Sequence, residues 1–337
     1  MVIASAMQPI WRFMVENNTQ LKEMIRSMVI DLLQGQKQEA ASSQPVKQAP
    51  RGQVEPGVFD TVDDAIQAAK AAQARFEDCT LATREKVIAD IRAAMRPRVQ
   101  ELAQKTVEET GMGRVADKVL KLNLTLDKTP GVEDLVTECE TGDNGMTLYE
   151  LSAYGVIGAI TPSTNPAETL ICNTIGMLAA GNAVFFSVHP GAKHLSRLLV
   201  SELNQIIAKS IGIENLIVTL REPSIESAQE MMLHPDVSLL VVTGGPGVVK
   251  QALQSGKKVI GAGAGNPPAF VDETADIKKA AQDIVLGASL DNNILCIAEK
   301  SVVAMRQIEP QLVQEMVKVG CVLIDNQQDI QRLVDLT

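Results

Sequence analysis

The stretch SLLVVTGGPG, residues 238–247, decides the fold, because it joins a buried strand to a helix through glycines. Its apolar run, residues 239–242, predicts a strand covered on both faces. The glycine turn that follows contains Thr243, Gly244 and Gly245. Such a turn leaves backbone N–H groups free at the positive end of the next helix, where a pyrophosphate can bind. The spacing is not the usual GxGxxG, and glycines also serve turn geometry alone, so both interpretations stay open.

Around this stretch, buried apolar runs alternate with amphipathic helical patterns. The predicted strands are residues 183–188, 216–220 and 238–242, and the predicted helices are residues 195–210, 225–233 and 246–255. Buried strands separated by helices specify a largely parallel, helix-covered sheet. The sequence therefore predicts an α/β architecture of the dinucleotide-binding type.

Helical spacing dominates the part of the chain before this sheet. Residues 63–74 and 83–110 carry Ala, Ile and Leu at helical intervals. Residues 146–154 alternate like a strand, and residues 155–160 form a short apolar run. We expect helices first and then the first strands of the sheet.

The N-terminal region combines a short amphipathic pattern with a polar tether. Apolar residues recur at steps of three and four over residues 21–33, which predicts a helix. Residues 34–53 are rich in Gln, Ala, Ser, Pro and Lys, a composition typical of a flexible linker. The apolar stripe either binds a partner or folds back onto the main body, and periodicity does not choose between these alternatives.

Composition excludes several classes of protein. A net charge of −10 over 337 residues, without dense Lys/Arg blocks, argues against nucleic-acid binding. No apolar run is long enough for a membrane span, and the N-terminus lacks the pattern of a secretory signal, so we expect a cytoplasmic protein. Five scattered cysteines without CxxC spacing predict neither disulfides nor zinc, and the three histidines have no metal-ligand spacing. No metal site is predicted.

Two short segments carry groups suited to chemistry. The polar segment TPSTNP, residues 161–166, follows a strand, at the end where open α/β sheets bind ligands. Its Asn165 amide could stabilise an oxyanion, but these residues alone favour an ordinary Asn-Pro turn. Cys296 lies between Leu295 and Ile297, where a cysteine is usually a small buried apolar residue.

Six motifs together resemble the CoA-acylating aldehyde dehydrogenases of bacterial microcompartments, which serve propanediol or ethanolamine use. The motifs are TPSTNP (161–166), HPGAK (189–193), VTGGPG (242–247), GAGAGNPP (261–268), VDETAD (271–276) and ASLDNNILCIAEK (288–300). They occur in the family's order, and the resemblance runs from about residue 54 to the late 320s. It implies an aldehyde dehydrogenase-like fold with an α/β catalytic domain after the dinucleotide-binding sheet.

The resemblance implies that Cys296 attacks a short-chain aldehyde, with the Asn165 amide and the Cys296 N–H holding the oxyanion. Hydride then passes to a nicotinamide dinucleotide, and coenzyme A receives the acyl group. Hydrolytic relatives carry a glutamate base where Ala262 stands here. The segment at residues 261–265 contains no carboxylate, so acyl transfer to a thiol is expected rather than hydrolysis.

The resemblance also assigns the cofactor contacts. It places Thr161, Pro162, Ser163, His189, Pro190, Thr243, Gly244, Gly245, Ala262 and Gly263 against the dinucleotide. We expect NAD, and NADP is not excluded, because hydrolytic relatives often have a lysine where His189 stands. Propionaldehyde is favoured over acetaldehyde, since HPGAK, Glu222-Pro223 and QEMMLHP (229–235) are closer to the propanediol branch.

The resemblance extends to partners and to domains. The N-terminal helix resembles encapsulation peptides, so we expect a shell-protein partner and a location inside a microcompartment. Residues 1–53 form the targeting helix and linker, 54–256 the dinucleotide-binding domain, and 257–337 a catalytic domain. Family members continue past Thr337, so this last domain is expected to be incomplete.

The expected oligomeric state depends on the missing part, and two other functions stay open. A homo-oligomer is expected if the C-terminus is complete, since residues 146–154 resemble half of the oligomerisation element. The chain could instead be an inactive cargo or assembly protein. A third alternative keeps the fold but reduces acyl phosphates.

Overall fold

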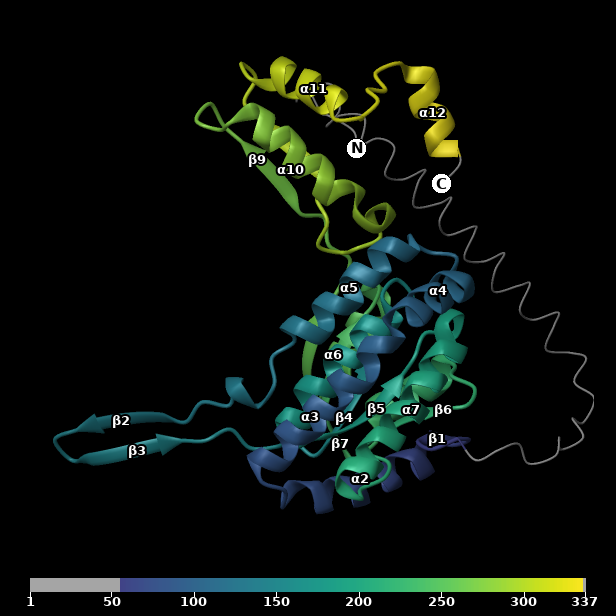
Figure 1. Ribbon diagram of the computed structural model, residues 1–337, viewed down its shortest axis with the longest axis vertical. Coiled ribbons are helices and arrows are strands. Elements are labelled where there is room, and N and C mark those ends of the chain that lie inside the picture. The colour runs from purple at the N-terminus through teal and green to yellow at the C-terminus, as the bar shows by residue number, and fades with distance from the viewer. Residues whose placement is uncertain (1–54, 336–337) are drawn as a thin grey trace, which may run out of the picture. The chain divides into compact units, whose positions relative to one another are not determined.

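The computed structural model describes residues 55–335 (Figure 1). Within these residues, contacts in space group the chain into two compact units. The first unit comprises residues 55–267 and 286–299, and the second comprises residues 268–285 and 300–335. The domain division predicted from the sequence, with boundaries after residues 53 and 256, stays a prediction. The predicted helix over residues 21–33 and its linker lie outside the described residues.

The first unit is built on a six-stranded sheet in which every pair of neighbours is parallel. The strands, in spatial order, are β1 (Val58–Phe59), β6 (Ile217–Leu220), β5 (Ala183–Ser187), β4 (Val156–Ile160), β7 (Val237–Thr243) and β8 (Lys258–Ala262). All residues of β4, β5 and β6 are buried. This confirms the predicted parallel, helix-covered sheet.

The strand order reverses its direction at β4. From β4 the chain steps outward to β5 and β6, then returns to the other side of β4 for β7 and continues to β8. Parallel crossovers are right-handed, so a reversal of direction also changes the face on which the connecting helices pack. β4 and β7 therefore flank a topological switch point.

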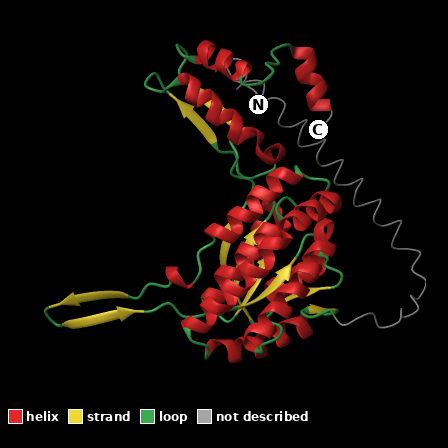
Figure 2. Ribbon diagram, in the orientation of Figure 1, coloured by secondary structure: helices red, strands yellow, loops and turns green. Residues whose placement is uncertain are grey.

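Helices cover both faces of the sheet (Figure 2). α6 (Pro166–Ala179) connects β4 to β5, and α7 (Lys193–Ile211) connects β5 to β6. On the return, α8 (Ile225–Leu233) connects β6 to β7, and α9 (Pro246–Gln254) connects β7 to β8. α3 (Leu81–Met95) packs against α6 and α7, whereas α2 (Val62–Glu77) packs against α8 and the sheet. No helix among residues 55–335 is long and apolar enough to cross a membrane.

The predicted helix over residues 83–110 is two helices in the structure. α3 ends at Met95, a single 3-10 turn (Arg96–Arg98) follows, and α4 (Val99–Thr110) begins next. Pro97 lies in that turn and has no N–H to continue the α-helical hydrogen bonds. α4 ends at Gly111, whose φ of 67° is left-handed, and α5 (Val115–Lys128) follows.

A two-stranded antiparallel hairpin extends from the body of the first unit (Figure 1). β2 (Glu138–Gly142) pairs with β3 (Gly145–Tyr149), and every residue of both strands is exposed. The sequence predicted a strand over residues 146–154. In the structure this strand ends at Tyr149, because Tyr149 pairs with Glu138, the first residue of β2, and no strand residue lies beyond that pair.

The second unit has its own small core. β9 (Pro268–Val271) pairs in parallel with β10 (Ser301–Ala304), and α11 (Glu309–Lys318) packs with them around Val271 and Leu312. α10 (Ile277–Ser289) begins in this unit, and α12 (Gln327–Asp335) has no buried residue.

Candidate functional site

The predicted cofactor-binding residues lie along one edge of the six-stranded sheet. Thr161 follows β4 directly, and its N–H donates to the Ser187 carbonyl at the end of β5 at 3.2 Å. Gly244, after β7, donates to the Ala262 carbonyl at the end of β8 at 3.1 Å. The residues on or just beyond these strand ends are Thr161, Pro162, Ser163, His189, Pro190, Thr243, Gly244, Gly245, Ala262 and Gly263. Parallel pairing therefore brings four separate sequence segments to one edge.

The switch point at this edge leaves two helix N-termini without a side-chain cap. α6 begins at Pro166 after β4, and α9 begins at Pro246 after β7. Among residues 55–335, no side-chain cap accepts a hydrogen bond from the free N–H groups at either start. Open α/β sheets bind ligands outside the carboxyl ends of strands at such a point.

The surroundings of the glycine turn fit a phosphate-bearing ligand. A Cβ added at Gly245 or Gly247 would meet no heavy atom within 4 Å, so the start of α9 is open. The Thr161 hydroxyl is buried and has no hydrogen-bond partner among the described residues. Uncapped N–H groups suit the phosphates of a dinucleotide, and an unpartnered hydroxyl suits its polar groups.

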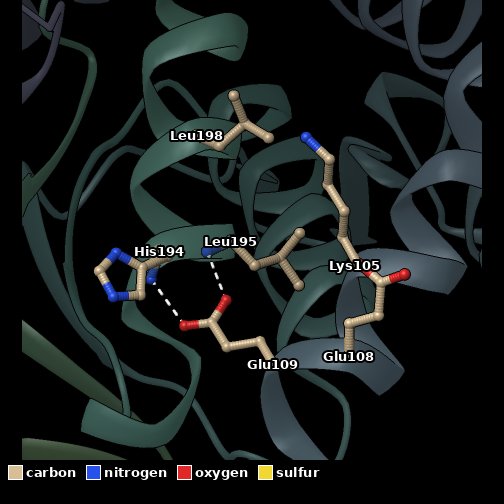
Figure 3. A pocket seen from close by; sticks show the side chains of 6 residues that line it. All are labelled: Lys105, Glu108, Glu109, His194, Leu195 and Leu198. Carbon is tan, nitrogen blue, oxygen red and sulfur yellow. Dashed lines mark hydrogen bonds between the residues drawn. The ribbon is translucent and has the colours of Figure 1, made fainter.

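The start of α7, by contrast, already holds an anion (Figure 3). The Glu109 carboxylate accepts from the N–H groups of His194 at 2.8 Å and Leu195 at 2.7 Å. A shallow pocket lies beside this cap and is lined by Lys105, Glu108, Glu109, His194, Leu195 and Leu198. Glu109 thus occupies the N–H groups at the start of α7 that could otherwise bind a phosphate.

His189 serves the backbone at the end of β5. Its Nδ1 accepts a hydrogen bond from the Gly191 N–H at 3.1 Å and caps the 3-10 turn Pro190–Ala192. The following Lys193 forms an ion pair with Glu222 at 2.6 Å. Both arrangements fix the loop that carries His189 and Pro190, two of the predicted dinucleotide contacts.

Cys296 is exposed on a loop that Asn293 holds in shape. The Asn293 amide donates to the carbonyls of Ala288 at 2.6 Å and Glu299 at 3.0 Å, so it ties the two ends of the loop together. Asp291, Asn292 and Asn293 have φ values of 50°, 55° and 60°. Asn and Asp tolerate this left-handed conformation better than most residues.

Asp291 anchors the same loop in the body of the first unit and has no exposed surface. Its carboxylate accepts from the Arg114 N–H at 2.8 Å and pairs with Lys118 at 3.0 Å and with Lys121. Its own N–H donates to Asp117 at 2.9 Å. These four polar contacts of one buried residue fix the loop five positions before Cys296.

Asn165 meets the same charged cluster from the β4–α6 connection. Lys121 Nζ donates to Asn165 Oδ1, and Asn165 Nδ2 donates to the Thr164 hydroxyl at 3.3 Å. Lys118 donates to the Thr164 carbonyl at 2.5 Å. Two lysines of α5 therefore connect the segment of Asn165 to the loop of Cys296.

Burial and hydrogen bonding act in opposite directions on these charges. Burial alone raises the pKa of the Asp291 carboxyl, but hydrogen bonds from both lysines and a backbone N–H hold its pKa below the ordinary value. Burial lowers the pKa of Lys118, while nearby carboxylates oppose that shift. Asp291 is therefore ionised at neutral pH.

The glycine segment predicted to lack a base packs directly against the cysteine. A Cβ added at Gly265 would collide with the Cys296 carbonyl oxygen, so the two backbones touch. Residues 261–265 carry only glycine and alanine. No ionisable side chain of that segment is available to activate water beside Cys296.

Sequence reasoning missed Lys118, Lys121, Asp291 and Glu168. A signal was present in α5, where Leu120 and Leu124 are 62% and 60% exposed while Lys118 and Lys121 are buried. Two lysines spaced three apart share a helix face, but without Asp291 in view that face resembles an ordinary charged surface. Across residues 55–335, no cluster of three His, Cys, Asp or Glu side chains could hold a metal ion.

Comparison with known proteins identifies close relatives. The aldehyde dehydrogenase family model matches residues 33–324. The chain is 48% identical, over 308 residues, to a CoA-propanoylating propanal dehydrogenase of Salmonella typhimurium, covering 91% of this chain and 64% of the relative. It is 49% identical, over 263 residues, to the acetylating acetaldehyde dehydrogenase EutE of Escherichia coli, covering 78% of this chain and 56% of that one.

A solved structure resembles the fold. The Rhodopseudomonas palustris propionaldehyde dehydrogenase, solved with bound CoA and an acylated cysteine, is 50% identical with a TM-score of 0.81, over 84% of this chain and 65% of that chain. The chain thus spans about two thirds of that protein's length, and 64% of the Salmonella relative's. A family match over most of the sequence, together with the parallel sheet and its switch point, establishes that the chain belongs to the aldehyde dehydrogenase family.

Proposed function

We propose that this chain oxidises a short-chain aldehyde to an acyl-CoA through a thioester on Cys296. The observation that carries the proposal is the packing of the Cys296 backbone against a glycine segment without a carboxylate. A cysteine beside a base-free segment suits acyl transfer to a thiol, because water has no general base there to activate it.

The first step uses Cys296 and Asn165. The Cys296 thiolate attacks the aldehyde carbon, a C–S bond forms, and the carbonyl π electrons move to oxygen. The Asn165 Nδ2 and the Cys296 N–H stabilise this oxyanion, because hydrogen-bond donors fixed in advance favour charge that develops in the reaction.

A nicotinamide dinucleotide, when bound, accepts the hydride that leaves the former aldehyde carbon. Thr161, Pro162, Ser163, His189, Pro190, Thr243, Gly244, Gly245, Ala262 and Gly263 would hold it at the carboxyl edge of the sheet. The uncapped start of α9 and the unpartnered Thr161 hydroxyl support this assignment. We propose NAD as the dinucleotide, with NADP as the comparison to measure.

The acyl group then leaves Cys296. The thiolate of coenzyme A attacks the thioester carbon, a new C–S bond forms, and the Cys296 thiolate departs. In total the aldehyde loses one hydride, the CoA thiol loses one proton, and CoA gains the acyl group. We favour propionaldehyde as the substrate, and acetaldehyde is the alternative that the 49% identity to EutE supports.

The test is NADH formation by the purified chain with propionaldehyde and NAD, measured with and without CoA. We expect CoA-dependent NADH that disappears in Cys296→Ala. Turnover without CoA would contradict acyl transfer. No turnover by the folded chain would contradict this activity for the chain as it stands. Equal or better turnover of acetaldehyde would overturn the substrate preference, and turnover with phosphate in place of CoA would favour acyl-phosphate chemistry.

We also propose that residues 8–35 direct the protein to a microcompartment shell. The amphipathic pattern of residues 21–33 supports this, since an apolar helical stripe suits a groove on a partner. Fusion of residues 8–35 to a fluorescent protein should produce foci in shell-producing cells, and diffuse fluorescence would contradict the proposal.

A second copy of the chain is the partner we propose for the β2–β3 hairpin. Met146 and Leu148 on β3 are 66% and 60% exposed, and both hairpin strands have an unpaired edge. Deleting residues 138–149 should lower the mass seen in light scattering if the native chain is oligomeric. A native chain that is monomeric at every concentration would contradict this partner.

A further inference from the structure

The Lys121 side chain occupies an unusual position among three acceptors. Its ammonium donates to Asn165 Oδ1 and to Asp291 Oδ2, and it lies 3.4 Å from Glu168 Oε1. Its side chain is 9% exposed. A lysine ammonium has three N–H groups and accepts nothing. Two of these groups donate to Asn165 and Asp291, and Glu168 is near enough for an ion pair.

This arrangement fixes the orientation of the Asn165 amide. An ammonium cannot accept a hydrogen bond, so the amide must present Oδ1 to Lys121 and turn Nδ2 away from it. Among the described residues, Nδ2 has one hydrogen bond, a 3.3 Å contact to the Thr164 hydroxyl. One of its two N–H groups is therefore left for a ligand.

The ammonium also changes the amide electronically. The Lys121 ammonium beside Oδ1 draws electron density from the Asn165 amide, which makes the amide N–H groups stronger hydrogen-bond donors. A low-dielectric site enlarges this effect. The same ammonium binds Asp291, five residues before Cys296. The orientation of the Asn165 amide and the position of the Cys296 loop thus both depend on the Lys121 side chain.

We propose that Lys121 is a positioning residue, which orients Asn165 toward the reacting oxygen and couples it to the Cys296 loop through Asp291. This inference rests on the proposed cysteine chemistry. It assigns Lys121 no contact with substrate and no proton transfer.

The neighbouring Lys118 provides a matched control. It is fully buried on the same helix and binds the same aspartate at 3.0 Å, but it contacts the Thr164 carbonyl instead of the Asn165 amide. Loss of either lysine removes a buried charge from the cluster. Only the loss of Lys121 frees Asn165 Oδ1.

The experiment measures two reactions of Cys296 in the full chain, neither of which needs the dinucleotide or CoA. The first is the p-nitrophenol burst with p-nitrophenyl acetate, in which a C–S bond forms, the ester C–O bond breaks and p-nitrophenolate leaves. This reaction passes through an oxyanion. The second is alkylation by iodoacetamide, which forms a C–S bond and releases iodide without an oxyanion.

We expect Lys121→Met to slow the burst about 100-fold, the range for loss of one oxyanion donor, with alkylation within about 3-fold of the native rate. Asn165→Ala should give a similar loss, and the double variant should lose little more, because both changes remove one function. Lys118→Met should slow the burst much less than Lys121→Met.

Several outcomes would overturn the proposal. These are a native burst rate in Lys121→Met, losses that multiply in the double variant, an equal loss in Lys118→Met, or an equal fall in alkylation. If Lys121→Met does not fold, Lys121→Met with Asp291→Asn removes both charges and should show the same burst loss. A native chain without a Cys296-dependent burst would contradict the proposed function as well, whereas a normal native burst with an unaffected Lys121 variant would contradict only the positioning role.

Discussion

The carboxyl edge of the sheet and the loop of Cys296 contribute different groups to the proposed site. The edge presents backbone N–H groups, glycines with open space and an uncapped helix start. The loop depends on buried side chains, with Asp291 and Lys118 at no exposure and Lys121 nearly so. The edge depends on the conformation of the backbone, whereas the loop depends on ion pairs between buried side chains.

This difference predicts different tolerance to substitution. An open backbone edge loses little stability when one side chain changes, because few side-chain contacts depend on it. A buried charge that loses its partner remains in a low-dielectric interior and is costly. The measurements below test that contrast, from the largest expected effect to the smallest.

Asp291→Ala should have the largest effect on stability. It strands the ammonium groups of Lys118 and Lys121, and breaking a buried ion pair in this way costs about 3–5 kcal/mol in unfolding free energy. The control is Asp127→Ala, which breaks an ion pair to Arg96 with both side chains about half exposed. That change should cost less than about 1 kcal/mol. Equal losses in urea unfolding would show that the cluster is not a buried anchor.

Gly265→Ala should be the next most harmful change. Its methyl group collides with the Cys296 carbonyl, so the backbone must shift at a cost of about 1–3 kcal/mol. Gly263→Ala, two residues earlier, meets no heavy atom within 4 Å and should leave the unfolding free energy close to native. The comparison needs only thermal unfolding of both variants. A native-like melting temperature for Gly265→Ala would contradict the close packing of the two backbones.

Glu109→Ala should destabilise the first unit by about 0.5–2 kcal/mol, the usual cost of losing a helix N-cap. Glu109 accepts from two N–H groups at the start of α7, whereas the adjacent, exposed Glu108 accepts from the Gln104 side chain at 2.8 Å. Glu108→Ala is therefore the matched control and should stay within about 0.5 kcal/mol of native. If the two variants unfold at the same denaturant concentration, the carboxylate does not cap α7.

Thr161→Val should have the smallest effect and the opposite sign. The Thr161 hydroxyl is buried and has no partner in the part of the chain that the structure describes, so a methyl group in its place should leave stability unchanged or raise it by up to about 1 kcal/mol. The same change should weaken NAD binding in a titration, because the hydroxyl is proposed to contact the dinucleotide. A clear loss of stability would mean that the hydroxyl has a partner in the folded protein.

The sequence predicted the sheet well, because buried parallel strands have a strong pattern. The predicted strand at 238–242 is Val237–Thr243 in the structure, and the predicted helix at 225–233 has the same bounds as α8. The exception was the helix over 83–110, where a single proline ends the α-helical hydrogen bonds that periodicity alone would continue.

The charged cluster was not predictable in the same way. Lys121 and Asp291 are 170 positions apart; Asp291 lies in the motif of Cys296, but Lys121 lies in none of the six motifs. Local pattern describes which face a residue occupies but not which distant residue meets it there. Asn165 and Cys296 were found through the resemblance to a family, and their roles stay predictions until the measurements above are made.

The separation of Lys121 from Asp291 has a consequence for how the protein is made. A ribosome synthesises α5 and most of the parallel sheet well before it reaches residue 291. Until then, Lys118 and Lys121 have the Glu168 carboxylate nearby but lack Asp291, and the sheet must form with this corner hydrated. Because contacts between distant residues form late, the nascent chain acquires its cysteine loop after the sheet. Chaperones that bind newly made chains would therefore meet this corner before its buried ion pairs are complete.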